Sequence, residues 1–159
     1  MERVKYITFV GRSSWAVVNS FSAVLFHTEI IPDEIHVLYK REDEEVAEVG
    51  ISGLYELLDV KEIGCELVQH VIEEDFDLLK PARVVEEIME SDGDVVIDIT
   101  PAKKFMSSTA LLEGRKYGVD GVFYLYIDHV EDADRPYLDI PLPRQDLIEM
   151  VEGEHYVRD

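Results

Sequence analysis

The sequence predicts a doubly wound, Rossmann-like α/β fold, a mostly parallel sheet of about five to six strands with helices on both faces. Two observations predict it. Short β-branched runs alternate along the chain with longer stretches of helical periodicity. The expected strands are also continuously apolar, as parallel strands covered on both faces are. Because crossovers between parallel strands are right-handed, the helices are distributed over both faces.

The first half of the chain supplies two strands and two helices. A β-rich run over Val4–Val10 predicts the first strand, which stops at Gly11. A helix is expected over Trp15–His27 and a second strand over Glu34–Tyr39. Apolar residues at helical spacing predict a second helix over Glu42–Val60.

The second half continues the alternation. We expect a third strand over Cys65–Ile72 and a helix over Asp77–Glu90. A fourth strand is expected over Asp94–Ile99, followed by a helix over Lys103–Tyr117. The fifth strand is expected over Gly121–Ile127. These elements predict the strand order 3-2-1-4-5 of a doubly wound sheet.

The C-terminal residues carry weaker patterns. The segment Tyr137–Leu142, between prolines, predicts an edge strand, and Gln145–Val151 predicts a short last helix. Since a domain takes ~150 residues, we predict one domain over residues 1–159. Its core covers about residues 1–128, and residues 129–159 form the C-terminal edge strand and helix.

The composition excludes several classes of protein. The chain has 15 Lys and Arg against 35 Asp and Glu, a net charge of −20, and 47% of its residues are hydrophobic. That hydrophobic content predicts a globular protein rather than a disordered one. Proteins that bind duplex nucleic acid or anionic membranes need a basic face, so neither partner is expected. The sequence shows neither an apolar signal peptide nor ~18 unbroken apolar residues, and we expect a cytoplasmic protein.

Metal and dinucleotide chemistry find little support in the sequence. The single Cys65 forms no intramolecular disulfide and predicts a buried structural thiol. The 5 histidines are scattered, without the spacing of metal ligands. Neither the G-x-G-x-x-G fingerprint nor a Walker loop is present. We therefore expect no metal and no cofactor.

The predicted topology places a ligand site at two particular loops. In doubly wound sheets, ligands bind beyond the carboxyl ends of the strands, where the strand order reverses. Here that point lies between the first and fourth strands. The loops concerned are Gly11–Trp15 and Thr100–Lys104.

These two loops carry positive charge where the other helix starts carry acid. An acidic run opens the second helix and another precedes the third, but Arg12 precedes the first, and Lys103 and Lys104 begin the fourth. Cations at a helix N-terminus cost ~0.3–1 kcal/mol each, unless an anion is bound there. The plainer alternatives are that both lysines are only solvated and that Ser13 or Ser14 only caps its helix.

Three further features of these loops have more than one interpretation. Thr100-Pro101 reads as an N-cap followed by Pro at the first helical position. Gly11 either serves a tight turn or lets the backbone approach a ligand. Asp98, at the end of the fourth strand, either binds a ribose hydroxyl, orients Lys104 or bonds to the loop backbone.

The helices that follow these loops are apolar around more than one face. Trp15–Phe26 carries large apolar residues beyond a single stripe, and Phe105–Leu112 mixes apolar and small residues around its girth. A helix of this kind is buried on more than one side. A second copy of the chain supplies that cover in a homodimer, which we expect. In the alternative, a monomer, neighbouring helices supply it.

The run Asp98–Ser107 resembles a known signature. It looks like the [Asp/Asn]-x-Thr-x-Gly-x-[Lys/Arg] pattern of CARF domains, the CRISPR-associated Rossmann-fold sensors, with Asp98, Thr100 and Lys104 matching. Pro101-Ala102 stands where that family has at least one glycine, which puts close backbone approach to a phosphate in doubt.

The resemblance implies a function. CARF domains dimerise and bind cyclic oligoadenylates, most often cyclic tetra-adenylate, across the dimer axis. About 30 residues follow the fifth strand, too few for the usual nuclease or winged-helix effector. A CARF domain on its own resembles the ring nucleases of type III CRISPR defence, which cleave the messenger without metal and leave a 2′,3′-cyclic phosphate.

The resemblance also implies roles for individual residues. Lys103 or Lys104 would stabilise the phosphate, Ser13 or Ser14 would orient the 2′-hydroxyl or a phosphate oxygen, and Arg12 would hold a neighbouring phosphate. The expected catalytic residues are Lys104, Lys103 and Ser14. The expected ligand-binding residues are Gly11, Arg12, Ser13, Ser14, Trp15, Asp98, Thr100, Pro101, Ala102, Lys103 and Lys104.

Two alternatives remain at the level of sequence. One is a non-catalytic CARF module that senses or sequesters the same messenger. The other is a Rossmann domain that binds another phosphorylated metabolite, or an interaction subunit.

Overall fold

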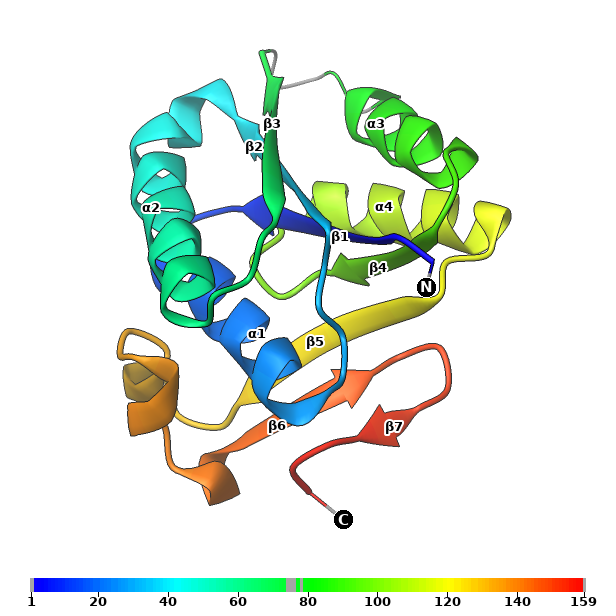
Figure 1. The fold of residues 1–159 in the computed structure, drawn as a ribbon. Helices are drawn as coiled ribbons and strands as arrows, with labels where there is room; N and C mark the ends of the chain where they lie inside the picture. Colours follow the sequence, from blue (N-terminus) through cyan, green and yellow to red (C-terminus); the bar gives the residue numbers. More distant parts are fainter. Residues whose placement is uncertain (1, 74–76, 78, 159) are drawn as a thin grey trace.

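A computed structural model describes residues 2–73, 77 and 79–158 of the chain. They form a seven-stranded sheet of order β3-β2-β1-β4-β5-β6-β7 with helices on both faces (Figure 1). The elements are β1 (Val4–Val10), α1 (Ser14–His27), β2 (Glu34–Lys40), α2 (Glu44–Val60), β3 (Glu66–Ile72), α3 (Leu79–Glu90), β4 (Asp94–Asp98), α4 (Lys104–Tyr117), β5 (Gly121–Ile127), β6 (Gln145–Glu149) and β7 (Glu154–His155). Short 3-10 helices are η1 (Arg41–Asp43), η2 (Val130–Asp132), η3 (Tyr137–Asp139) and η4 (Leu142–Arg144).

The parallel part of the sheet confirms the predicted topology. Strands β3, β2, β1, β4 and β5 pair in parallel and in the expected order. The elements from β1 to β5 lie within two residues of their predicted bounds. The expected start of the third helix includes Leu78, and the acidic run before it includes residues 74–76, which lie outside the described residues.

The C-terminal elements correct the prediction. Tyr137–Leu142 is not an edge strand but lies in η3 and the start of η4. The neighbouring prolines explain the difference, because proline fixes φ and cannot donate to a ladder. Gln145–Val151 is not a helix: its first five residues form β6, which pairs antiparallel with β5. The free edge of β5 needs backbone partners, and this requirement outweighs local helix propensity.

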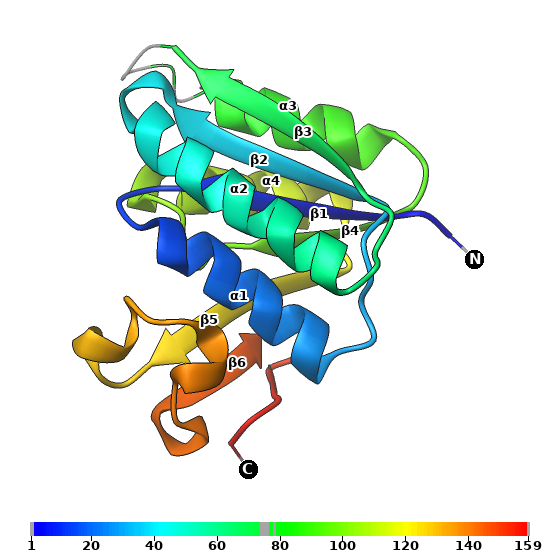
Figure 2. The ribbon, with the colours of Figure 1, turned by 60° about the vertical axis from the view of Figure 1, so that its left-hand side comes forward.

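The sheet separates two apolar cores. Helices α1 and α2 cover one face, and α3 and α4 cover the other (Figure 2). On the first face, a Cβ added to Gly53 would lie 2.6 Å from Cγ2 of Val18. The glycine therefore lets α2 pack closely on α1, and α2 covers part of the apolar surface that the sequence assigned to a dimer.

Part of that surface nevertheless stays open. Trp15 and Phe26 of α1 are 39% and 61% exposed, and Leu112 of α4 is 74% exposed.

Cys65 is half-buried, and burial raises the pKa of its thiol to about 11. In the part of the chain that the structure describes, every helix is too short or too polar to cross a membrane.

Candidate functional site

The loops that follow β1 and β4 meet at the carboxyl edge of the sheet. The two strands are direct neighbours, so their loops leave the sheet side by side. A Cβ added to Gly11 would lie 2.6 Å from the carbonyl oxygen of Pro101. No side chain fits at that distance, so glycine is needed where the loops touch. Close approach of the backbone, rather than a positive φ, accounts for Gly11.

The start of α1 carries Arg12 and two serines. Ser13 is the N-cap, and its Oγ accepts a hydrogen bond from the backbone N–H of Ala16 at 3.4 Å, as predicted. Ser14 is the first helical residue, and the first turn contains no acidic residue. Arg12 is exposed and forms no hydrogen bond or ion pair with any residue that the structure describes. The positive end of α1 therefore has no anion of its own.

The start of α4 differs from the prediction. Thr100 does not cap the helix; Lys103 is the N-cap, without a side-chain capping bond. Residues 99–103 separate β4 from α4. They include a turn in which the N–H of Ala102 donates to the carbonyl of Ile99. Thr100 instead ties this loop to β5, since its Oγ1 accepts from the N–H of Leu125 at 2.9 Å.

Asp98 lies under the loop and does not reach the surface. Its side chain is fully buried and accepts hydrogen bonds from the Tyr6 hydroxyl at 2.9 Å and the Ser20 hydroxyl at 2.5 Å. It also accepts from the N–H of Thr100 at 3.0 Å. Burial raises the pKa of Asp98 against the opposing effect of these donors. Of the three expected roles, this geometry matches the bond to the loop backbone.

Lys103 is already engaged by two carboxylates. Its Nζ lies 2.6 Å from Oδ2 of Asp43 and 3.1 Å from Oε1 of Glu42, both at the start of α2. Burial alone would lower the pKa of Lys103, but the hydrogen bonds and attraction of these carboxylates outweigh it and raise the pKa. The lysine is therefore charged and held against α2.

Sequence reasoning missed a further cation at this edge. Lys40 ends β2, 3.6 Å from the Glu42 carboxylate and 5.0 Å above the Phe105 ring. Its position at the carboxyl end of a strand beside β1 was the available signal. Lys104, by contrast, is exposed, and its ammonium group forms no hydrogen bond or ion pair within the described ranges. Arg12 and Lys104 are thus the cations of the two loops that are available to an anion.

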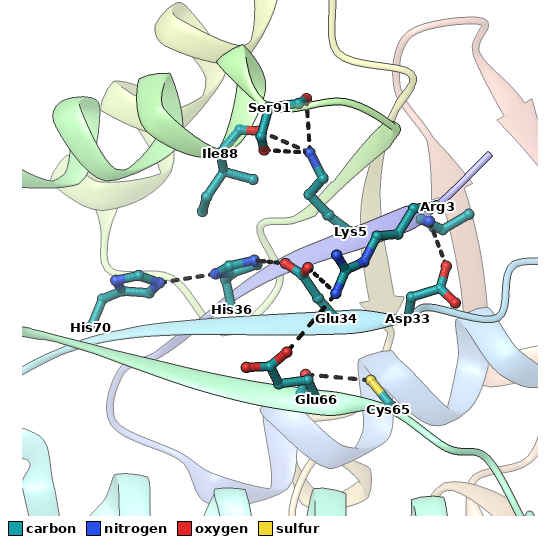
Figure 3. Close-up of polar contacts among 11 residues, drawn as sticks. Arg3, Lys5, Asp33, Glu34, His36, Cys65, Glu66, His70, Ile88 and Ser91 are labelled. Atoms are coloured by element: carbon teal, nitrogen blue, oxygen red, sulfur yellow. Dashed lines mark hydrogen bonds and ion pairs between the residues drawn. The ribbon is translucent and has the colours of Figure 1, made fainter.

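A second polar network lies at the other end of the sheet (Figure 3). His36 of β2 shares a hydrogen bond with His70 of β3, at 3.0 Å between Nδ1 and Nε2, and its Nε2 lies 2.8 Å from Glu34. The buried Lys5 donates to the carbonyls of Ile88 and Ser91 at the end of α3. Among the described residues, no group of three or more side chains is arranged to hold a metal ion.

The histidine pair predicts a dependence of stability on pH. Burial lowers the pKa of His36, and burial with neighbouring positive charge lowers that of His70 to about 4. Unfolded histidines titrate near ~6.5, so the unfolded chain binds more protons below that pH. The stabilisation is complete above pH ~6.5 and is lost as the pH falls toward the folded pKa. Between pH 7 and pH 4, the free energy of unfolding of the His70→Gln variant should therefore fall by about 2 kcal/mol less than that of the wild type.

The measurement is the free energy of unfolding in urea at several pH values between 7 and 4. Carboxylates titrate in the same range, so the difference between wild type and His70→Gln is the informative quantity. His129→Gln, at an exposed position, is the control. Parallel pH profiles for wild type and His70→Gln would contradict the prediction.

The same fold occurs in solved structures of other proteins. Can2 from Sulfobacillus thermosulfidooxidans, in complex with cyclic tetra-adenylate, matches with a TM-score of 0.63 and 14% sequence identity, over 98% of this chain and 37% of that one. Protein VC1899 from Vibrio cholerae matches with a TM-score of 0.64 and 11% identity, over 98% and 36%. The fold is CARF-like.

The similarity lies in structure rather than in sequence. No family model matches the chain, and no curated protein matches it. The CARF-like chain spans little more than a third of the length of Can2 and VC1899, at 37% and 36%. At these identities the comparison establishes the fold, and the function has to be argued from the site.

Proposed function

We propose that this chain binds cyclic tetra-adenylate at the β1–α1 and β4–α4 loops and cleaves it as a metal-independent ring nuclease of type III CRISPR defence. The observation that carries the proposal is the pair of available cations, Arg12 and Lys104, at the starts of two adjacent helices in a CARF-like fold. Can2, which shares the fold, was solved in complex with cyclic tetra-adenylate.

The charge distribution supports an anionic ligand. The chain has a net charge of −20, yet neither α1 nor α4 has an acidic residue in its first turn. Helix α2 has two, Glu44 and Glu45. Backbone N–H groups and cations at two helix starts favour phosphate. A bound phosphate would explain why the starts of α1 and α4 carry cations, whereas the start of α2 carries acidic residues.

The proposed reaction needs orientation and charge stabilisation. The 2′-oxygen of a ribose attacks the adjacent phosphorus, the bond to the 5′-oxygen breaks, and a 2′,3′-cyclic phosphate forms. The proton of the 2′-hydroxyl is lost, and the departing 5′-oxygen gains one. Lys104 stabilises the charge that develops on phosphate, and Arg12 holds a neighbouring phosphate. Ser14 orients the attacking hydroxyl, because the Ser13 oxygen already caps α1.

A homodimer is part of the proposal. A ring of four identical nucleotides has two-fold symmetry, which matches two copies of the chain related by a two-fold axis. Each copy would contribute one pair of loops. The exposed apolar side chains of α1 and α4, Trp15, Phe26 and Leu112, support contact with a second copy.

The test is incubation of the purified chain with cyclic tetra-adenylate in EDTA, with products followed by chromatography and mass detection. Linear products ending in a 2′,3′-cyclic phosphate are expected. Sedimentation of the same sample measures the oligomeric state. A chain that neither binds nor cleaves the ring would overturn the assignment.

Binding without turnover is a second candidate, favoured by one observation. Lys103 is paired with Asp43 and Glu42, which leaves fewer cations to stabilise a reacting phosphate. A module that only senses or sequesters the messenger needs no such stabilisation. Tight binding of the intact ring, with no products in the same experiment, would identify this function.

The two carboxylates lead to a prediction for binding. They compete with phosphate for Lys103 and add negative charge beside the site. The double variant Glu42→Gln with Asp43→Asn should therefore bind cyclic tetra-adenylate about three- to tenfold more tightly, if each ion pair at this surface is worth ~0.2–1 kcal/mol. Isothermal titration calorimetry at two salt concentrations measures the effect.

The matched control is Glu48→Gln, which removes an exposed acid elsewhere on α2. It should leave the affinity within a factor of two, because its charge is screened over a Debye length of ~8–10 Å. Equal affinities for the double variant and wild type would mean that Lys103 takes no part in binding.

A further inference from the structure

A hollow of about 340 Å³ opens beside Arg12. Two walls come from the N-terminus of α1 and the first turns of α2, and a third comes from the segment after η2. Its lining residues are Arg12, Ser13, Ser14, Trp15, Glu45, Val46, Val49 and Asp134. Small-molecule sites have volumes of ~300–1,000 Å³, so this one suits a single nucleotide base rather than a whole oligonucleotide.

Trp15 lines one side of the hollow. Trp15 is the only tryptophan in the chain and is 39% exposed at the second position of α1. It also borders a second hollow of about 530 Å³ against α2. Val49, on the facing helix, is 62% exposed. An open indole beside apolar side chains is a surface on which a planar base stacks.

Two carboxylates in the hollow disfavour a second phosphate beside the one that Arg12 would hold. Glu45 and Asp134 are exposed and form no hydrogen bond or ion pair with the residues that the structure describes. Ionised carboxylates only accept hydrogen bonds. They repel phosphate and favour a group that donates N–H, such as the exocyclic amine of adenine or cytosine. The hollow therefore has an acidic part and, at Arg12, a basic one.

We propose that this hollow is a nucleobase subsite that selects an amino-bearing base. The base stacks on Trp15, its exocyclic amine donates to Glu45 or Asp134, and the attached phosphate lies at Arg12. This inference rests on the proposed function, which makes the ligand an adenine nucleotide. It adds the part of the site that distinguishes one base from another.

The first experiment uses the intrinsic fluorescence of the wild-type chain, because its only tryptophan lines the hollow. Adenosine 5′-monophosphate should quench or shift the emission. Inosine 5′-monophosphate, in which oxygen replaces the amine, should bind about tenfold more weakly. Inorganic phosphate should leave the emission unchanged.

The second experiment measures variants by isothermal titration calorimetry with cyclic tetra-adenylate and with both mononucleotides. Trp15→Ala should weaken binding of adenine ligands about five- to 100-fold, the range found for base–aromatic stacking, while Trp15→Phe stays within threefold of wild type. Tyr55→Ala, at an exposed position on α2 outside the hollow, is the control. Thermal unfolding of each variant establishes that it is folded.

The double variant Glu45→Gln with Asp134→Asn tests the selection of the base. Amides donate as well as accept, so the preference for adenosine over inosine monophosphate should fall to within twofold. If wild type binds the cyclic ligand and neither Trp15→Ala nor the double variant alters binding, the subsite is wrong and the proposed function stands. Adenosine monophosphate binding that depends on Trp15, without cyclic tetra-adenylate binding, supports the subsite and overturns the ligand. No binding of any adenine nucleotide overturns both.

Discussion

Replacing Lys104 by alanine is expected to slow cleavage of cyclic tetra-adenylate by about 10²–10³-fold and to change its affinity by less than about fivefold. The exposed ammonium has no partner within the described ranges, and the N-cap beside it has no side-chain capping bond. A donor aimed at charge that develops only in the transition state contributes mainly to the rate. Single-turnover kinetics with excess protein separate cleavage from binding.

Lys116→Ala is the matched control, because Lys116 is an exposed lysine at the opposite end of the same helix, paired with Glu113. It should cleave at the wild-type rate. If Lys104→Ala loses affinity as strongly as it loses rate, the lysine only binds the ring. An unchanged rate would remove Lys104 from the mechanism and leave Lys103 as the lysine to test.

Replacing Asp98 by alanine is expected to lower the free energy of unfolding by about 3–5 kcal/mol, a large part of the ~5–15 kcal/mol of an ordinary domain. The carboxylate is fully buried and accepts from Tyr6, Ser20 and the N–H of Thr100. Its removal leaves the Tyr6 hydroxyl and the N–H of Thr100 without an acceptor, each at a cost of ~1–3 kcal/mol, while Ser20 keeps the Ala16 carbonyl as acceptor. Urea denaturation followed by circular dichroism measures the change.

Two further variants make this test specific. Asp98→Asn keeps an acceptor oxygen and should lose less stability than the alanine variant. Asp59→Ala removes an exposed acid from α2 and should be neutral within about 0.5 kcal/mol. A loss below about 1 kcal/mol for Asp98→Ala would show that water or a rearranged loop replaces the carboxylate.

The sequence predicted the parallel part of the sheet because its signals are periodic and repeated. Each strand from β1 to β5 is a short apolar run, and each is followed by a polar turn. No such period exists around Pro136 and Pro141, so the 3-10 helices were missed. The strand β6 depends on the free edge of β5, which is a property of the assembled sheet and not of residues 145–149.

Topology selects the loops of the candidate site, but the contacts within these loops were not predictable from the sequence. The rule that ligands bind where strand order reverses was enough to select the loops of Gly11 and Thr100. The ion pair of Lys103 with Asp43 depends on the distance between the starts of α2 and α4, which neither helix sequence determines by itself. For Asp98, a signal did exist: Ser20 lies at helical spacing from Val17 and Val24, on a face of α1 where an apolar residue is expected.

The contact between Gly11 and the Pro101 carbonyl also determines how the two loops move. Since only a hydrogen atom fits between them, a shift of the Gly11 loop toward Pro101 would require the second loop to move with it. A pair of loops that is ordered before the ligand arrives loses little conformational entropy on binding. Association is then governed by diffusion and by the electric field of the chain.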